Sequence, residues 1–347
     1  MLLTKEKNMK QRLIIIATFI FYLVTCSVSF ADVLFSEDFN NLPDWQPSSA
    51  NASCDYPSCT TPPVENWTYF RNDEKWHPSS FSDKQPTLQI STQHYRGNSG
   101  KAYTQWNESH SGTSGDGWGA DGILQKVFDQ DHNELYIQLY VLFQQNFQLY
   151  HTGYGEALIK LIRFMHWDRT GSSFRYFTNG YSCPAYIFDI GDNDWGFRQK
   201  HAFRCDPQES NYYCGGDSYG DQVYNGSPSF NELYGDGQWH QLRWHIKMNS
   251  QPGADNGIIE FWVDGTKQFS RSDMQWVGAG SPANIGWNTF GIGGNAYNSY
   301  APETQQAEQW YAIDDIVIST TSFEDPISIP TIPTPTIQTI SNNRPNN

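Results

Sequence analysis

The feature that most restricts the fold of this chain is a period of two in its apolar residues. Residues 135–144, 242–248 and 258–264 each place apolar side chains at alternate positions, and Asp264 and Gly265 follow as a turn signal. Successive side chains of a strand point to opposite faces, so these segments predict half-buried antiparallel strands. Helical periodicity is nearly absent. Strands without intervening helices predict an all-β jelly-roll sandwich of two antiparallel sheets.

Residues 1–31 carry the features of an export signal. Basic residues precede the apolar run Leu13–Val24, and Ser29–Ala31 forms a small-x-small cleavage site. This run is short for a membrane span, and no other segment is long and apolar enough to cross a bilayer. A lipoprotein box ending at Cys26 is the alternative, although Thr25 is unusual before such a cysteine. We therefore expect a secreted protein, extracellular or periplasmic, without a membrane span.

The remainder of the chain predicts one folded domain and a tail. Residues 32–324 are enough for a single large core, and all-β sandwiches often reach this size as one domain. Residues 325–347 are rich in Pro, Thr and Asn, which is typical of an extended, unpacked and disordered linker. We expect the domain to be a monomer.

The charge of the chain argues against nucleic acid as a partner. The formal net charge is −15, and because residues 1–31 contribute +3, the remainder carries −18. Such a surface repels phosphate backbones. Aromatic residues make up 16% of the chain, and their flat rings suit a sheet surface that stacks on sugars, although most belong to the core. Polysaccharide is the expected partner, and an acidic polysaccharide would require a local basic cleft.

Five cysteines lie beyond the signal segment, and export makes disulfides possible. Cys54 and Cys59 would close one short loop and Cys205 and Cys214 another, which leaves Cys183 over. A bridge from Cys183 to Cys205 or Cys214 is the alternative, because sequence does not determine connectivity. None of the spacings is that of a zinc site.

Several short motifs occur in the order expected for a known fold. They are Phe35–Phe39, Asn98–Ala102, Glu134–Tyr140, Gly237–His240, Leu242–Asn249, Trp262–Gly265 and Tyr311–Val317. This arrangement resembles concanavalin-A-like jelly rolls, in particular the laminin-G-like and polysaccharide-lyase-like families, over residues 33–320. The resemblance implies a concanavalin-A-like sandwich. It implies no single activity, because this fold hosts lectins, hydrolases and lyases.

A basic island interrupts the acidic chain between residues 160 and 204. Within it, Lys160, then Ser173 and Arg175, then Tyr186 follow the Lys … Ser-x-Arg … Tyr order of alginate-lyase-like and glucuronan-lyase-like secreted proteins, which this segment resembles. The resemblance implies a cleft in which Lys160, Arg175 and Tyr186 are catalytic and Ser173 binds substrate. Arg175 would hold a uronate carboxylate, and Lys160 or Tyr186 would move the proton in a β-elimination.

The island departs from that family in two places. Phe188 stands where the family has a second Tyr, and residues 162–167 replace a Gly-rich stretch. His166 shares the face of Lys160 by strand parity and is a second candidate base. The alternative reading is a row of strand residues that brace one another through ion pairs.

Three further positions are candidate substrate-binding residues. Tyr136, Gln138 and Tyr140 share one face of a predicted strand, where a Gln can hydrogen-bond a carboxylate or a hydroxyl. The alternative function for the whole domain is a non-catalytic, lectin-like carbohydrate-binding module. A glucanase-type hydrolase is disfavoured, because the Glu-x-Asp-x-(x)-Glu run that would supply its paired carboxylates is missing.

The terminal strands suggest a metal. Jelly rolls that resemble this chain bind structural calcium where the first and last strands meet, and Glu37, Asp38 and Asp315 supply the hard oxygen ligands that calcium prefers. We expect no organic cofactor.

Overall fold

The computed structural model describes residues 33–47, 53–54, 64–72, 88–108, 120–149, 157–167, 169, 184–192, 196–204, 213–214, 217–218, 221–223, 228–280, 285–297 and 308–323. The chain divides into two compact units, Met1–Asp32 and Val33–Asn347, and every described residue belongs to the second. The expected signal segment and tail lie outside the described residues, and so does at least one cysteine of each expected disulfide.

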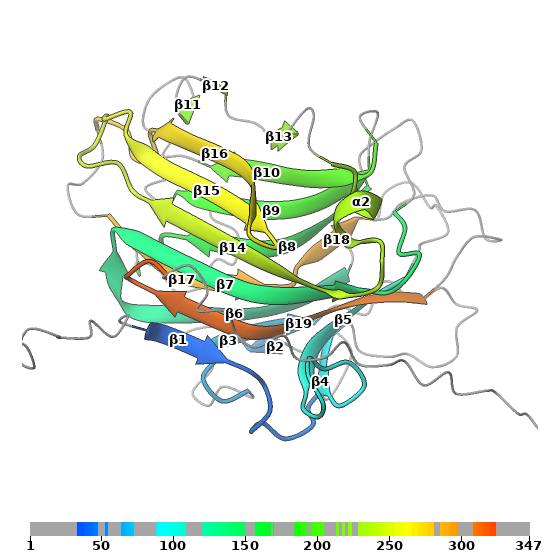
Figure 1. Ribbon diagram of the computed structural model, residues 1–347. Coiled ribbons are helices and arrows are strands. Elements are labelled where there is room, and N and C mark those ends of the chain that lie inside the picture. The colour runs from blue at the N-terminus through cyan, green and yellow to red at the C-terminus, as the bar shows by residue number, and fades with distance from the viewer. Residues whose placement is uncertain are drawn as a thin grey trace, which may run out of the picture. The chain divides into compact units, whose positions relative to one another are not determined.

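The first sheet has eight strands among the described residues. Its order is β16 (Thr266–Met274), β15 (Gly257–Val263), β14 (Trp239–Lys247), β7 (Glu134–Phe143), β19 (Glu308–Ser319), β5 (Ala102–Glu108) and β4 (Leu88–Ser91), and β1 (Val33–Glu37) also pairs with β19. All of these pairings are antiparallel. The first strand therefore lies beside the last, as Figure 1 shows.

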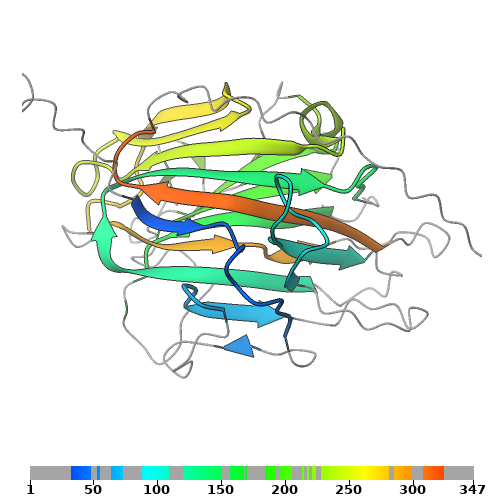
Figure 2. The same ribbon diagram turned by 60° about the horizontal axis from the view of Figure 1, so that its bottom comes forward.

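The second sheet has nine strands among the described residues. Its order is β13 (Asp221–Val223), β10 (Arg198–Arg204), β9 (Ala185–Asp192), β8 (Ala157–Met165), β17 (Trp287–Ile292), β6 (Ala120–His132), β3 (Tyr69–Asn72) and β2 (Ser53–Cys54), with β18 (Asn295–Tyr297) pairing with β6 and β8. A separate pair, β11 (Tyr213–Cys214) and β12 (Asp217–Ser218), completes the described strands. Figure 2 shows the two large sheets as stacked layers.

The core fills the space between the sheets. In β7 every second residue is buried, so that Leu135, Ile137, Leu139 and Val141 point inward while their neighbours are partly exposed. β14 and β15 alternate in the same way. The alternation read from the sequence in these three segments is therefore confirmed, and so is the all-β sandwich of two antiparallel sheets.

The central strands of the nine-stranded sheet behave differently. Every residue of β8 and nearly every residue of β9 is buried, on both faces of the sheet. One face packs on the eight-stranded sheet, and the face that points away from it is covered as well. Side chains on that second face therefore have little contact with solvent. A charged group there needs a partner, because burial makes an unpaired charge costly.

One short helix accompanies the strands in the described part of the chain. Helix α2 (Phe230–Tyr234) begins at a capping box, in which Ser229 and Glu232 satisfy each other's backbone N–H groups. Phe230 and Tyr234 pack on Phe143, which fixes the helix at the end of β7. No helix in the described ranges is long and apolar enough to cross a membrane.

Candidate functional site

A row of charged residues crosses three neighbouring strands of the nine-stranded sheet. Lys160 of β8 is the register partner of Asp189 of β9, and Asp189 is in turn the partner of Lys200 of β10. Register partners share a face, with Cβ atoms about 5 Å apart. The core neighbours Phe188 and Ile190 flank Asp189 in sequence, so the row lies on the face that points away from the other sheet.

The three residues of this row, called here the lysine row, are almost completely covered. Lys160 is 8% exposed, Asp189 2% and Lys200 3%. Ammonium groups are rarely buried unless a carboxylate accompanies them, because removing a charge from water is costly. The row itself brings two lysines and one carboxylate together in this low-dielectric position. It is the concentration of basic side chains on one sheet face that an acidic polymer would require.

A bulge in β8 adds an arginine to the same face. The register shifts between Lys160 and Ile162, so Ile162 points to the core and Arg163 joins Lys160 on the covered face. The Arg163 guanidinium is fully buried, and its Nη1 donates to the carbonyl of Gly293 at 2.9 Å. Gly294 follows with no side chain, and a Cβ there would lie 2.6 Å from Arg163 Nη2. Arg163 is thus fixed in place by its contacts with Gly293 and Gly294, between β17 and β18.

Tyr186 does not share this face. Its ring lies in the core between the sheets, stacked on Phe164, and its hydroxyl is 2.6 Å from His201 Nδ1 and 3.2 Å from Trp244 Nε1 of the eight-stranded sheet. Burial raises the pKa of Tyr186 well above its usual value of 10. The expectation that Lys160 and Tyr186 face one groove is therefore corrected: the three-residue separation of Tyr186 and Asp189 puts them on opposite faces of β9.

His166 is also placed differently from the parity argument. The bulge shifts the alternation by one residue, so parity with Lys160 no longer holds. The His166 imidazole is buried just after β8, with Nδ1 2.7 Å from the carbonyl of Gly286 and 3.5 Å from the carboxylate of Asp131. These contacts tie the start of β17 to β6. Ser173 and Arg175 lie outside the described residues, so their relation to Lys160 stays a prediction.

The candidate substrate-binding residues Tyr136, Gln138 and Tyr140 lie on the other sheet. They occupy the outer face of β7 and alternate with its buried positions. Tyr136 stacks on His245 at 4.4 Å between ring centres, and its hydroxyl donates to Glu134. Since the outer faces of the two sheets lie on opposite sides of the sandwich, these residues and Lys160 cannot line one groove.

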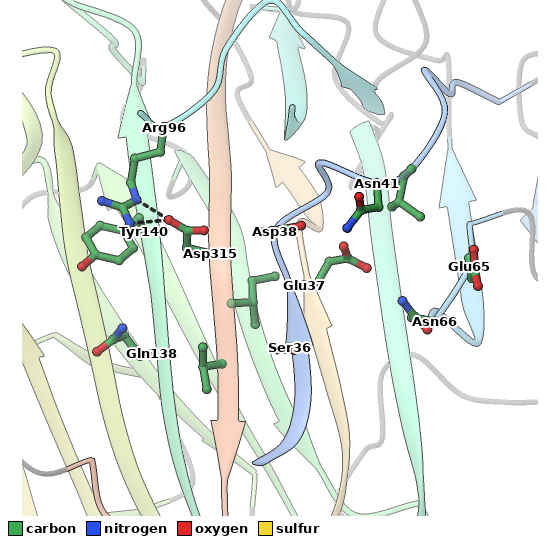
Figure 3. Close-up of a pocket in the computed structure, with 13 residues that line it drawn as sticks. Ser36, Glu37, Asp38, Asn41, Glu65, Asn66, Arg96, Gln138, Tyr140 and Asp315 are labelled. Atoms are coloured by element: carbon green, nitrogen blue, oxygen red, sulfur yellow. Dashed lines mark hydrogen bonds and ion pairs between the residues drawn. The ribbon is translucent and has the colours of Figure 1, made fainter. Parts of the chain in front are cut away.

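Gln138 and Tyr140 instead line a cavity of about 500 Å³ near the end of β1. The strands β1, β7 and β19 contribute to it, together with the segments around residues 41 and 66. All three candidate calcium ligands, Glu37, Asp38 and Asp315, belong to its lining. Figure 3 shows the Glu37 carboxylate between the amides of Asn41 and Asn66, with Arg96 and Tyr140 next to Asp315.

An arginine organises one wall of this cavity. The Arg96 guanidinium forms an ion pair with Asp315 and lies 3.9 Å from the centre of the Tyr140 ring. The backbone N–H of Arg96 donates to Asp314 at 3.0 Å. Burial raises the pKa of Asp314 to about 7 and also raises the pKa of Glu37. A register shift in β19 after Asp314, with Asp315 at φ 48°, presents the two neighbouring carboxylates at this point.

The calcium expectation meets competition from these contacts. Asp315 is paired with Arg96, and the Asp38 carboxylate accepts the N–H of Asn40. Among the described residues no three His, Cys, Asp or Glu side chains come together as metal ligands do. A calcium ion here would have to draw on amide or backbone oxygens in addition to the carboxylates that remain unpaired with Arg96, so calcium at this position stays a prediction.

Sequence reasoning missed two members of the lysine row and one of the cavity. Asp189 and Lys200 were visible only as charges of the basic island, and the pairing register that aligns them with Lys160 has no sequence signal. Arg96 lies in a segment without a strand pattern. A lone Arg next to an aromatic residue, here Tyr95, gives no warning that it pairs with Asp315 more than 200 positions away.

Two stacked antiparallel sheets, the first of which pairs the first strand β1 with the last strand β19, make this domain a jelly-roll sandwich. Residues 196–313 match the model of the polysaccharide lyase 14 family, a match that includes Lys200 but not Lys160 or Asp189. A comparison with curated proteins gives no significant match.

Solved structures of similar fold include polysaccharide lyases. A mutant of the alginate lyase Aly36B in complex with alginate trisaccharide is 13% identical and covers 85% of this chain and 100% of that chain, with a TM-score of 0.47. An endo-β-1,4-glucuronan lyase from the fungus Trichoderma reesei is 13% identical and covers 83% and 95%, with a TM-score of 0.49. An alginate lyase from a Chlorella virus is 14% identical and covers 66% and 88%, with a TM-score of 0.46.

Proposed function

We propose that this protein is a secreted polysaccharide lyase that cleaves a uronate-containing polymer by β-elimination. The observation that carries the proposal is the lysine row, two lysines and one aspartate aligned on one sheet face of an otherwise acidic chain. The partial match to the polysaccharide lyase 14 family supports the same reaction class. The export features of residues 1–31 support action outside the cytoplasm.

The chemistry assigns a role to each lysine. Lys200, together with Arg175 if it reaches this face, holds the uronate carboxylate, which makes the C5 proton easier to remove. Lys160 takes that proton in its neutral amine form, because an ammonium has no lone pair to accept one. The C5–H and C4–O bonds break, a C4=C5 double bond forms, and the proton ends on the leaving oxygen or in solvent.

The test is the appearance of unsaturated products from a panel of polyuronates, followed by ultraviolet absorbance. Lys160→Met keeps the aliphatic packing and removes the amine, and we expect it to lower kcat by about a hundredfold or more. Lys200→Met should mainly raise KM. Lys267→Met is the matched control, because Lys267 is 46% exposed on the eight-stranded sheet, where it pairs with Glu260 and lies over the Trp262 ring, far from the lysine row. Equal activity in all three variants and the wild type would remove Lys160 and Lys200 from the reaction.

A non-catalytic carbohydrate-binding module is the second candidate. The near-complete burial of the lysine row favours it, because buried ion pairs also serve structure. A protein of this kind would bind a polyuronate in a titration and release no unsaturated product at any protein concentration. In such a protein Lys160→Met would lower the melting temperature, because it removes part of a buried charged cluster, and there would be no turnover to change.

Export is tested separately by the mass of the secreted protein. The proposal expects a mature N-terminus at Asp32. A diacylglyceryl group on Cys26 would establish the lipoprotein alternative instead.

A further inference from the structure

The cavity beside β1 lies on a different part of the sandwich from the lysine row. It is built on the eight-stranded sheet, whose outer face points away from the nine-stranded sheet. Its volume of about 500 Å³ lies in the range of small-ligand pockets, about 300 to 1,000 Å³. We propose that this cavity binds a neutral, hydroxyl-rich saccharide unit, and so gives the protein a second carbohydrate site that takes no part in bond cleavage.

The lining offers both partners that a sugar hydroxyl needs. A hydroxyl group donates one hydrogen bond and accepts others. Carboxylates, which accept only, come from Glu37, Asp38 and Glu65, and amides, which also donate, come from Asn41, Asn66 and Gln138. Acceptors and donors side by side match vicinal diols. The Tyr140 ring adds an aromatic surface to the same wall.

One lining group is already short of a hydrogen bond. Glu37 is 6% exposed, and its Oε1 accepts the N–H of Phe39 at 2.8 Å. Its Oε2 has no donor at full hydrogen-bond geometry among the described residues, and the nearby Asn66 and Trp67 side chains lower the pKa of this carboxyl by less than burial raises it. A buried carboxylate oxygen without a donor is costly. A ligand hydroxyl that donates to Oε2 removes this cost and so contributes favourably to binding in the cavity.

Charge decides which saccharide enters. The lining carries four carboxyl groups, Glu37, Asp38, Glu65 and Asp315, and one guanidinium, Arg96, which is committed to Asp315. A uronate would meet repulsion from this surface and find no unengaged cation among the lining residues. A neutral unit avoids the repulsion and uses the hydrogen bonds. The two sites would then divide the work: the lysine row attracts acidic units, and this cavity holds neutral ones.

A cation is the competing occupant of this cavity. Calcium could use the amide oxygens of Asn41, Asn66 and Gln138 as well as carboxylates, but a cation would leave the N–H donors of these amides unused and would meet the positive charge of Arg96. A calcium titration distinguishes the two occupants.

The experiment is a calorimetric titration of the full chain with neutral oligosaccharides built from glucose, mannose, galactose or xylose. We expect at least one of these probes to bind, and Asn41→Ala and Gln138→Ala each to weaken that binding by about tenfold, the loss of one or two hydrogen bonds. Gln268→Ala is the matched control on the same sheet, since Gln268 lies outside the cavity and donates to the backbone of Thr266. All three variants change polar side chains near the surface, and unchanged melting curves will verify their folding.

The result is separable from that of the proposed lyase reaction. Lys160→Met should keep full affinity for the neutral probe, whatever it does to turnover. The inference is overturned if no neutral oligosaccharide binds, or if bound probe is insensitive to both Asn41→Ala and Gln138→Ala. It is equally overturned if calcium chloride, titrated in the same way, binds and Asp38→Asn abolishes the binding, because the cavity would then be a cation site.

Discussion

Replacing Tyr186 with Phe tests whether this residue serves the core or the chemistry. The change removes one hydroxyl and keeps the ring that stacks on Phe164. Burial lowers the pKa of His201 to about 3, so its imidazole is neutral at physiological pH. Tyr186 can then donate to His201 Nδ1 at 2.6 Å while it accepts from Trp244 Nε1 at 3.2 Å.

The size of the effect follows from these two bonds. The variant leaves two buried polar atoms without their partner, and each such atom costs about 1–3 kcal/mol, so we expect a loss of about 2–6 kcal/mol in the free energy of unfolding. For a domain of this size, each kcal/mol lowers Tm by about 2 °C, which predicts a shift of about 4–12 °C. Denaturant titration and a thermal melt would measure it.

A matched control is the same change on the outer face of the other sheet. Tyr136→Phe removes a hydroxyl that donates to Glu134 at 2.9 Å in a partly exposed position, and we expect it to cost less than about 0.5 kcal/mol. Turnover by Tyr186→Phe, measured well below its Tm, should stay within a few-fold of wild type. If stability were unchanged and turnover fell by about a hundredfold, the placement of Tyr186 in the core would be refuted.

Three further predictions concern single positions. Gly294→Ala places a Cβ against the backbone carbonyl of Lys160 and 2.6 Å from Arg163 Nη2. Because the backbone cannot move aside as a side chain can, the substitution should cost about 3 kcal/mol or more, measured by denaturant titration. Burial raises the pKa of Asp314 to about 7, so its contribution is full below pH 4 and is lost as the pH rises through about 7; in Asp314→Asn this part of the pH dependence should vanish. Burial lowers the pKa of His240, but hydrogen bonds to Asp264 and Asp236 outweigh it and raise the pKa above 6.5. His240→Gln should therefore lose more stability at pH 6 than at pH 8, and an equal loss at both would contradict this.

Much of the fold could be predicted because it depends on local alternation. In β7, β14 and β15 one face is buried and the other is solvated, so the sequence alternates and the strand is visible. β8 is buried on both faces and gives no such alternation. Its bulge at residue 161 leaves no mark in the sequence either, and that bulge is why parity failed for His166.

The candidate site was harder to predict because it depends on register. A charge such as Asp189 is visible in the sequence, but its neighbours are set by how β8, β9 and β10 align. Shifting one strand by a single residue would put a lysine on the core face. The assignment of Tyr186 rested on family order alone, and the core contacts that hold it come from the facing sheet. Residue types are visible in the sequence, but which of them become neighbours depends on how the strands pair, and this is why the site residues were predicted less well than the strands.

The place of β19 has a consequence for how this chain can be made and rearranged. It is the last described strand in sequence, yet it lies inside its sheet with β7 and β5 on either side. During synthesis the sheet therefore stays split until residues 308–319 emerge, with two open strand edges that can aggregate. Such distant pairing also makes folding slow. Because Val33 pairs with Ser319, the two ends of the sandwich can be joined and new ends opened at the Asp264–Gly265 turn. Such a circular permutant would form the β5–β19–β7 core from segments much closer in sequence, and it should fold faster than the natural order.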